Sequence, residues 1–454
     1  MIDASRLAYY LAVYMKGERL IREYKFAKKK QYDTLEGIQE YQIKEFKRLY
    51  RYAYENIPFY NRLYKKHGLA FDEEISFEFI SRLPTIQKKD IIHNQNLMIN
   101  DSSIGLFATR KTTGGSTGEP VTIYKNPRAL AAERAVTWVG YEWAGISIAD
   151  RHVRIWGDPI DVKQTFKRRI IDLFANRLRL SAFALSDKQF NDYYKKVSNF
   201  KPVYLYGYVS ALLSFSEYIF KNNLALPKTV KAVIATSEVL TPWIKSEMEK
   251  NFGVRVYNEY GCGEVGSIAH ECERGGLHLM ETNVFVEVDA EDGAEGELIV
   301  TDLTNYLMPL IRYRIGDYGA IDSSMCQCGR MLKKLSNIHG RAYDCLVRSN
   351  GEKVHPEAVM YILEMVKAKY GALIDKFKVI QKSLDILDVL LIVPHGQLEF
   401  EVEEVIKNEL IKKLPDLKHI NFKYVNKIGR EKSGKMRVVV SEVGSSQNTI
   451  SLSG

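Results

Sequence analysis

Short apolar runs alternate with helical patterns between residues 150 and 305, and this alternation limits the fold more than any other feature. Buried strands are expected at 152–156, 203–206, 230–235 and 254–257, with helices at 210–220 and 242–251. Strand–helix alternation favours an α/β fold with parallel pairing, in which ligands bind at the carboxyl ends of the strands.

Glycine or acidic residues follow three of these strands. They are Gly207, the pair Ser237-Glu238, and the pair Tyr260-Gly261. Two alternating runs, 284–288 and 297–300, are joined by Asp292-Gly293 and predict a hairpin. We therefore expect a large domain with mixed and parallel sheets and helices, and a ligand site where the parallel strands end.

A loop rich in glycine and hydroxyl groups precedes this region. Glycine tolerates the backbone angles of a concave turn, so the backbone N–H groups and hydroxyls can surround a phosphate. A solvated surface turn is the alternative that composition alone leaves open. The loop is not a Walker A motif, because Glu119 stands where that motif has lysine. Its residues are Thr112, Thr113, Gly114, Gly115, Ser116, Thr117, Gly118, Glu119 and Pro120.

The pattern changes at Arg341, which predicts a second domain. A strand at 345–347, a helix at 356–369, strands at 376–380 and 386–393, a helix at 400–414 and a strand at 420–425 give the order βαββαβ. We expect an N-terminal domain over 1–340 with a helical lead-in over 1–70. A small, mobile α+β domain over 341–443 and a disordered tail over 444–454 complete the chain.

Charge and cysteine content limit the partners and the compartment. The net charge of +9 suits an anionic partner, but the basic clusters are short, which argues against nucleic acid. Five cysteines do not form a disulfide framework. The first residues lack the order of a signal peptide, and the apolar run 7–15 is far too short to span a membrane. We expect a cytoplasmic protein with no transmembrane segment.

Four further stretches follow the glycine-rich loop in a fixed order, and together they indicate nucleotide chemistry. Residues 258–264 place an aromatic ring, glycines and a carboxylate on one turn, and 313–317 end an apolar strand with Asp317. Residues 340–344 fall at the domain boundary, and Lys432-Ser433-Gly434-Lys435 form a flexible basic turn.

With these five motifs the chain resembles the adenylate-forming superfamily of acyl-CoA synthetases. It is most similar to the phenylacetate–CoA ligase branch, with its CapK-like relatives in capsular polysaccharide biosynthesis. The resemblance implies that Thr112–Gly118 hold the β- and γ-phosphates of ATP and that Ser237, Glu238, Tyr260 and Gly261 bind adenine. It further implies that Glu264 holds Mg²⁺, Asp317 the ribose hydroxyls, and Arg341 the ribose or phosphates. Lys435 would then reach the carboxylate of the substrate acid and the α-phosphate of ATP.

Three positions depart from the family pattern. Gly263 removes a hydroxyl that usually precedes Glu264, Glu119 replaces a frequent lysine, and Tyr343 replaces the first of two hinge acids, leaving Asp344. These departures bear on the strength of the CoA half-reaction.

Cysteine and histidine form a second constellation. Cys272 and His278 lie six residues apart, and Cys326 and Cys328 flank one residue, so the four would complete a Cys₃His zinc site. Free thiols in loops are the alternative from spacing alone, and similar pairs in the ligase branch favour structural zinc. Cys262 has no adjacent base and is interpreted as a passive turn residue.

The function predicted is the ATP- and Mg²⁺-dependent activation of a small carboxylic acid to an acyl-adenylate, followed by transfer to CoA or another acceptor. A degenerate nucleotide-binding scaffold in polysaccharide assembly is the alternative, and nucleic-acid binding has the weakest support. A homodimer is left open.

Overall fold

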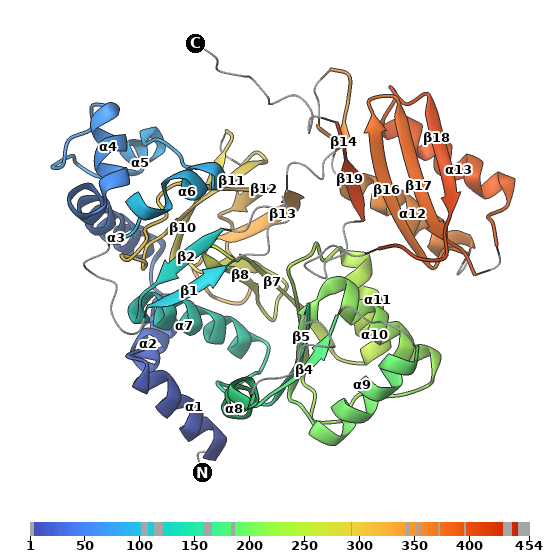
Figure 1. Ribbon diagram of the computed structural model, residues 1–454, viewed down its shortest axis with the longest axis horizontal. Helices are drawn as coiled ribbons and strands as arrows, with labels where there is room; N and C mark the ends of the chain where they lie inside the picture. The colour runs from blue at the N-terminus through green and yellow to red at the C-terminus, as the bar shows by residue number, and fades with distance from the viewer. Residues whose placement is uncertain are drawn as a thin grey trace. The chain divides into compact units, whose positions relative to one another are not determined.

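The computed structural model describes residues 4–100, 108–112, 121–157, 166–182, 187–291, 293–341, 346–350, 353–354, 356–370, 373–394, 396–429 and 438–443. Its chain forms two compact units, Met1–Ile338 and His339–Gly454, which are described in turn (Figure 1). The predicted tail over 444–454 lies outside the described residues.

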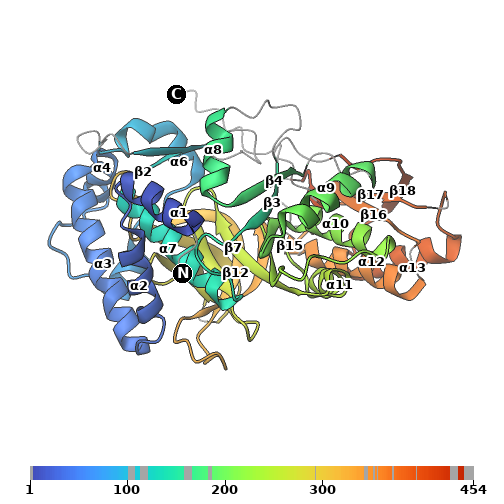
Figure 2. The ribbon, with the colours of Figure 1, turned by 90° about the horizontal axis from the view of Figure 1, so that it is seen from below.

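Helices form the beginning of unit 1, as the near absence of glycine predicted. Thr34 caps α3 by accepting a hydrogen bond from the Gly37 N–H, and α2 packs along α7 (Figures 1 and 2). The aromatic rings of Tyr50, Tyr60 and Tyr64 are fully buried here. The helices are α1 (Ala4–Met15), α2 (Leu20–Lys30), α3 (Leu35–Asn56), α4 (Pro58–Lys66), α5 (Phe77–Arg82), α6 (Lys88–Asn94) and the 3₁₀ turn η1 (Gln95–Leu97).

Most strands of unit 1 belong to one mixed sheet. Among the described residues its order is β10-β11-β12-β13-β9-β8-β7-β6-β5-β3-β4. The strands are β3 (His152–Trp156), β4 (Arg177–Ser181), β5 (Tyr204–Tyr208), β6 (Ala232–Thr236), β7 (Arg255–Cys262), β8 (Gly266–Glu271), β9 (Leu277–Leu279), β10 (Val284–Asp289), β11 (Gly296–Asp302), β12 (Tyr313–Asp322) and β13 (Lys334–Arg341).

The half of the sheet from β4 to β7 is parallel, as the alternation of strands and helices predicted. Thr241 and Pro242 begin α11, and Gly253 ends it in the left-handed conformation, with φ of 69°. α7 packs on the face that carries Tyr204, Ile234 and Tyr257, and α10 contacts β3, β5 and β6. The helices are α7 (Pro127–Trp143), α8 (Phe166–Phe174), α9 (Asp187–Phe200), α10 (Val209–Lys221) and α11 (Pro242–Phe252).

The other half of the sheet is antiparallel. β10 and β11 pair as the predicted hairpin, from Val284 opposite Asp302 to Asp289 opposite Glu297. A separate hairpin of β1 (Thr109–Thr112) and β2 (Thr122–Lys125) carries the glycine-rich loop between its strands. Strand pairing therefore brings Thr112 and Thr122, on either side of this segment, opposite each other.

Three sequence expectations about strand ends need correction. Gly207 lies within β5, and Tyr260 and Gly261 lie within β7, because β7 continues past its parallel neighbour by pairing with β8. Asp317 lies in the middle of β12, since pairing with β11 continues the strand to Asp322.

Unit 2 contains the predicted elements in the order βαββαβ, together with two further strands, β15 and β19. Its four-stranded sheet has the order β18-β17-β16-β19, and the first predicted strand pairs instead with β15. β19 joins the sheet parallel to β16. The elements are β14 (Leu346–Val347), β15 (Lys353–Val354), α12 (Pro356–Tyr370), β16 (Lys376–Ser383), β17 (Ile386–Ile392), α13 (Phe400–Lys413), β18 (His419–Tyr424) and β19 (Val439–Ser441).

Candidate nucleotide and metal sites

Two predicted nucleotide-binding residues are joined directly by a hydrogen bond. The Tyr260 hydroxyl donates to Asp317 Oδ2 over 2.8 Å, although 57 positions separate the two residues. Their strands, β7 and β12, are not neighbours in the sheet. A carboxylate has several acceptor sites, so Asp317 can accept this bond and still accept bonds from a diol.

The pairing of β6 with β7 brings Ser237, just after β6, beside Tyr260, within β7. Thr236 is paired with Glu259 in the parallel ladder, and Ser237 and Tyr260 are the next residues on each strand. Ser237 has φ of 68°, a left-handed angle that turns the chain sharply out of the strand. Ser237 and Tyr260, two of the predicted adenine-binding residues, therefore lie side by side where β6 ends.

Glu238 joins the loop after β6 to the first turn of α10. Its carboxylate accepts hydrogen bonds from the Ser210 backbone N–H over 2.6 Å and from the Ser210 hydroxyl over 3.0 Å. Ser210 lies in the first turn of α10, whose N-cap residue, Tyr208, makes no side-chain cap. Glu238 thus stabilises the helix N-terminus and fixes the loop after β6.

The turn between β7 and β8 carries Glu264, which is buried. Gly261 and Gly266 lie so close at this turn that a Cβ on Gly261 would stand 2.3 Å from the Gly266 carbonyl oxygen. Only glycine permits that approach. Burial raises the pKa of Cys262 far above its ordinary value, so this thiol is a poor nucleophile.

A buried ion cluster connects the β1–β2 hairpin to the turn that carries Glu264. The sequence did not predict this cluster. Lys125, on β2, is fully buried and lies 3.0 Å from both Asp302 Oδ2 and Glu133 Oε2. Its ammonium also donates to the carbonyl of Val265, the residue after Glu264. Lys111, on β1, binds the same Glu133 carboxylate.

Electrostatics favours the charged forms of Glu133 and Lys125 in this cluster. Burial alone would raise the pKa of Glu133, but Lys125 and Lys111 outweigh burial and lower it to about 2. Burial alone would lower the pKa of Lys125, but Asp302 and Glu133 hold it well above its ordinary value. The cluster lies at the base of the hairpin, so its charges fix the hairpin against β11 and α7.

One further carboxylate, Glu259, lies beside Tyr260. It accepts hydrogen bonds from the Tyr141 hydroxyl over 2.7 Å and from the Ser267 hydroxyl over 3.3 Å. Burial raises its pKa above the ordinary value. These bonds attach α7 and β8 to β7 immediately before Tyr260, which is predicted to bind adenine.

Some predicted residues cannot be placed. Thr112 ends β1, and its hydroxyl lies 3.3 Å from that of Thr122, but Thr113–Gly118 lie outside the described residues. So do Lys435, Tyr343 and Asp344. Arg341 is the last residue of β13, and its side chain is not described.

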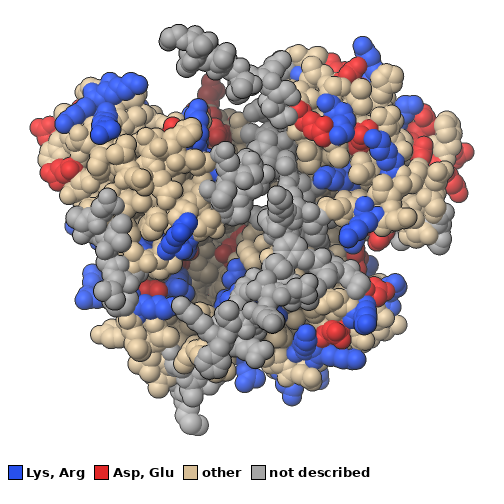
Figure 3. Space-filling model, viewed as in Figure 1, with Lys and Arg blue, Asp and Glu red and all other residues tan. Residues whose placement is uncertain are grey.

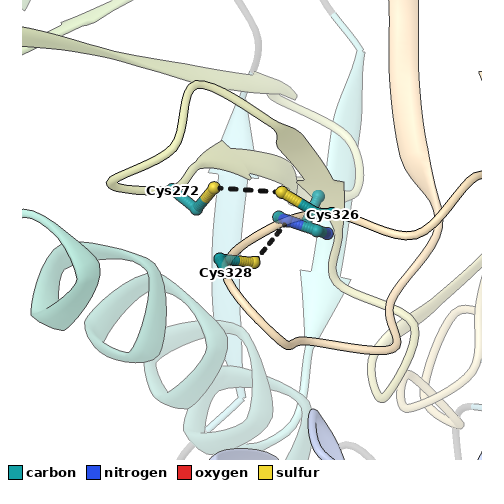
Figure 4. A group of neighbouring side chains, drawn as sticks. Cys272, Cys326 and Cys328 are labelled. Atoms are coloured by element: carbon teal, nitrogen blue, oxygen red, sulfur yellow. Dashed lines mark hydrogen bonds between the residues drawn. The ribbon is translucent and has the colours of Figure 1, made fainter.

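The structure brings the four predicted zinc ligands together (Figure 4). Cys272, His278, Cys326 and Cys328 place their ligand atoms within 4.8 Å of one another. Cys272 Sγ and Cys326 Sγ are 3.8 Å apart, and Cys328 Sγ is 3.2 Å from His278 Nε2. A sulfur–sulfur distance of about 3.8 Å is the edge expected of a tetrahedron around zinc and is far too long for a disulfide.

The surroundings of the cluster suit a metal ion. His278 Nδ1 lies 2.8 Å from the Leu332 carbonyl, which fixes the tautomer with Nε2 as the ligand. The turn after β8 curves through Gly275, with φ of 86°, and holds Cys272 opposite the loop of Cys326 and Cys328. Cys272 and His278 are both fully buried.

Comparison with known proteins extends over nearly the whole chain. Protein CapK of Staphylococcus aureus is 27% identical over 89% of this chain and 89% of its own length. Phenylacetate–coenzyme A ligase of Thermus thermophilus is 25% identical over 72% of this chain and 75% of its own length. The chain is a homologue of CapK and of the phenylacetate–coenzyme A ligases.

A family model matches the C-terminal part of the chain, and a solved structure shares its fold. Residues 346–442 match the CapK C-terminal domain. A 2-hydroxyisobutyryl-CoA ligase, solved in the postadenylation state with 2-HIB-AMP, superposes with a TM-score of 0.72 over 91% of each chain, at 18% identity. The predicted family resemblance and α/β fold class are confirmed.

None of the helices in the described part of the chain is long and apolar enough to cross a bilayer.

Proposed function

We propose that the chain is an ATP- and Mg²⁺-dependent ligase that converts a carboxylic acid to an acyl-adenylate and passes the acyl group to CoA. The observation that carries the proposal is the hydrogen bond from Tyr260 to Asp317. It joins an aromatic ring suited to adenine and a carboxylate suited to a ribose diol, and Ser237 and Glu264 lie close by, after β6 and in the turn after β7. The names of the homologous coenzyme A ligases support the same reaction.

The chemistry fits the residues assigned to it. A carboxylate oxygen attacks the α-phosphorus, the bond to the β-phosphate breaks, and pyrophosphate leaves. Two anions approach one another, so the site must supply positive charge and hydrogen-bond donors where charge accumulates. Thr112–Gly118 would hold the phosphates, Glu264 would hold Mg²⁺, Arg341 would contact the ribose or phosphates, and Lys435 would neutralise the reacting oxygens.

Pyrophosphate exchange into ATP, with a panel of carboxylic acids, tests the proposal. We expect at least one acid to support exchange. Lys435→Ala should lower the rate by about 100-fold or more, the typical cost of one charge that stabilises a transition state. Lys432→Ala, three residues earlier in the sequence, is the matched control and should exchange normally. A folded, ATP-binding protein that exchanges with no acid would overturn the ligase assignment.

A nucleotide-binding protein without turnover, which acts in polysaccharide assembly, is the second candidate. It is favoured by Gly263, which replaces the usual hydroxyl beside Glu264, and by the similarity to CapK. The exchange experiment separates the two candidates, because tight ATP binding without exchange would support this one.

We further propose that Cys272, His278, Cys326 and Cys328 bind a structural zinc ion. All four ligands come from the protein, so no position stays open for catalysis. Bound zinc would connect the turn after β8 to the loop before β13.

Metal content and thermal unfolding test the zinc proposal. The purified protein should contain one zinc ion per chain, and Cys328→Ser should lose it and unfold at a lower temperature. Cys262→Ser, outside the cluster, is the control and should keep its zinc. Full stability after zinc removal by a chelator would contradict a structural role.

A further inference from the structure

The first helix of unit 1 buries one side and exposes an apolar stripe on the other. Tyr9 and Val13 pack on the core around Trp138, and the Tyr9 hydroxyl accepts a hydrogen bond from Trp138 Nε1. On other positions of α1, Leu11, Tyr14 and Met15 are 53%, 73% and 76% exposed. Leu7 is also exposed, and the spacing 7, 11, 14 and 15 places these side chains on one face of the helix.

α8 contacts α1 and adds apolar surface beside it (Figures 1 and 2). Its Ile170, Ile171 and Phe174 are exposed, and Leu173 is 73% exposed. The acid of this helix, Asp172, does not face solvent, because Arg177 and Arg179 bind it. The exposed residues of α1 and α8 named above form what we call the N-terminal apolar patch.

The exposed charge along and just after α1 has one sign. Among the described side chains of residues 4–30, those that are charged and exposed are all basic: Lys16, Arg19, Arg22, Lys25, Lys28 and Lys29, of which Lys28 is paired with Glu142. Glu18 is buried against Arg134, and Glu23 is half-buried. Elsewhere, Lys and Arg stand beside Asp and Glu at several places on the face drawn in Figure 3.

We propose that the N-terminal apolar patch binds the surface of an anionic lipid membrane. Exposed Leu, Ile, Phe, Tyr and Met can enter the boundary between headgroups and acyl chains while the adjacent Lys and Arg side chains contact anionic headgroups. A second copy of the chain fits less well, because a symmetric contact would bring two sets of basic residues together. The proposal does not depend on the ligase activity.

Sedimentation with lipid vesicles tests the membrane proposal with the full-length protein. We expect binding to phosphatidylcholine vesicles that contain phosphatidylglycerol, little binding to phosphatidylcholine alone, and weaker binding at high salt. Leu11→Ser with Tyr14→Ser should weaken binding about tenfold or more, and so should Arg19→Gln with Arg22→Gln. Phe400→Ser, which removes an exposed apolar side chain from unit 2, is the control and should bind normally.

Two outcomes would overturn the proposal. One is equal binding to both vesicle types, or none, by a protein whose circular dichroism shows that it is folded. The other is self-association in light scattering that the Leu11/Tyr14 variant abolishes, which would make the patch an interface between copies. The charge variant keeps the test decisive if the apolar variant unfolds, since the side chains of Arg19 and Arg22 are exposed.

Discussion

At the scale of single residues, the hydrogen bond between Tyr260 and Asp317 can be tested directly by substitution. Tyr260→Phe removes the 2.8 Å hydrogen bond while keeping the ring, so we expect the KM for ATP to rise about fivefold to tenfold with a smaller change in kcat. Asp317→Asn should raise the KM for ATP further, since the charged acceptor for the ribose is lost.

Steady-state exchange kinetics at varied ATP check both variants. Tyr257→Phe, on the same strand, is the matched control and should leave the KM unchanged. An Asp317→Asn protein with the ordinary affinity for ATP would show that this carboxylate positions Tyr260 and does not touch the nucleotide.

Some site residues can be predicted from the sequence, and others can be found only from the fold. Tyr260, Glu264 and Asp317 stand in recognisable motifs, and the structure joins the first and third. Lys125 and Asp302 belong to no motif. They lie 177 positions apart, and each alone reads as a surface charge, so only the fold shows that both are buried.

At the scale of elements, the β1–β2 hairpin depends on the ion cluster at its base. Glu133→Gln removes the carboxylate shared by Lys111 and Lys125 and should lower the free energy of unfolding by about 3 kcal/mol near neutral pH. The native pKa of Glu133, about 2, lies below its value in the unfolded chain. Its contribution is therefore complete above pH 5 and lost as the pH falls toward 2.

Urea unfolding at a series of pH values checks this sign. The difference in unfolding free energy between wild type and Glu133→Gln should shrink steadily on acidification. Glu142→Gln, on the same helix and bonded to the exposed Lys28, should cost much less. A wild-type advantage that is the same at all pH values would mean that the carboxylate stays charged or contributes only packing.

The elements found from sequence alone were those with long apolar runs. β4 reads Arg-Leu-Arg-Leu-Ser and was missed, because its arginines look exposed until Asp172 is placed between them. β15 and β19 have two and three residues, too few for a periodic pattern, and β19 joins its sheet only through distant β16. Length and local periodicity therefore set what the sequence could predict.

At the scale of the whole molecule, each unit buries its own hydrophobic core. Val256, on β7, and Val389, on β17, are both fully buried. Multi-domain chains commonly unfold in more than one step, so calorimetry should resolve a transition for each unit. Val389→Ala removes two buried methyl groups and should destabilise unit 2 by about 2 kcal/mol, shifting one transition only.

Val256→Ala is the matched test on unit 1 and should shift the other transition while leaving the first in place. The two substitutions remove the same groups from equally buried sites. The transition that each variant shifts therefore identifies the unit that unfolds in it. A single transition that both variants lower by the same amount would show that the two units unfold as one cooperative body.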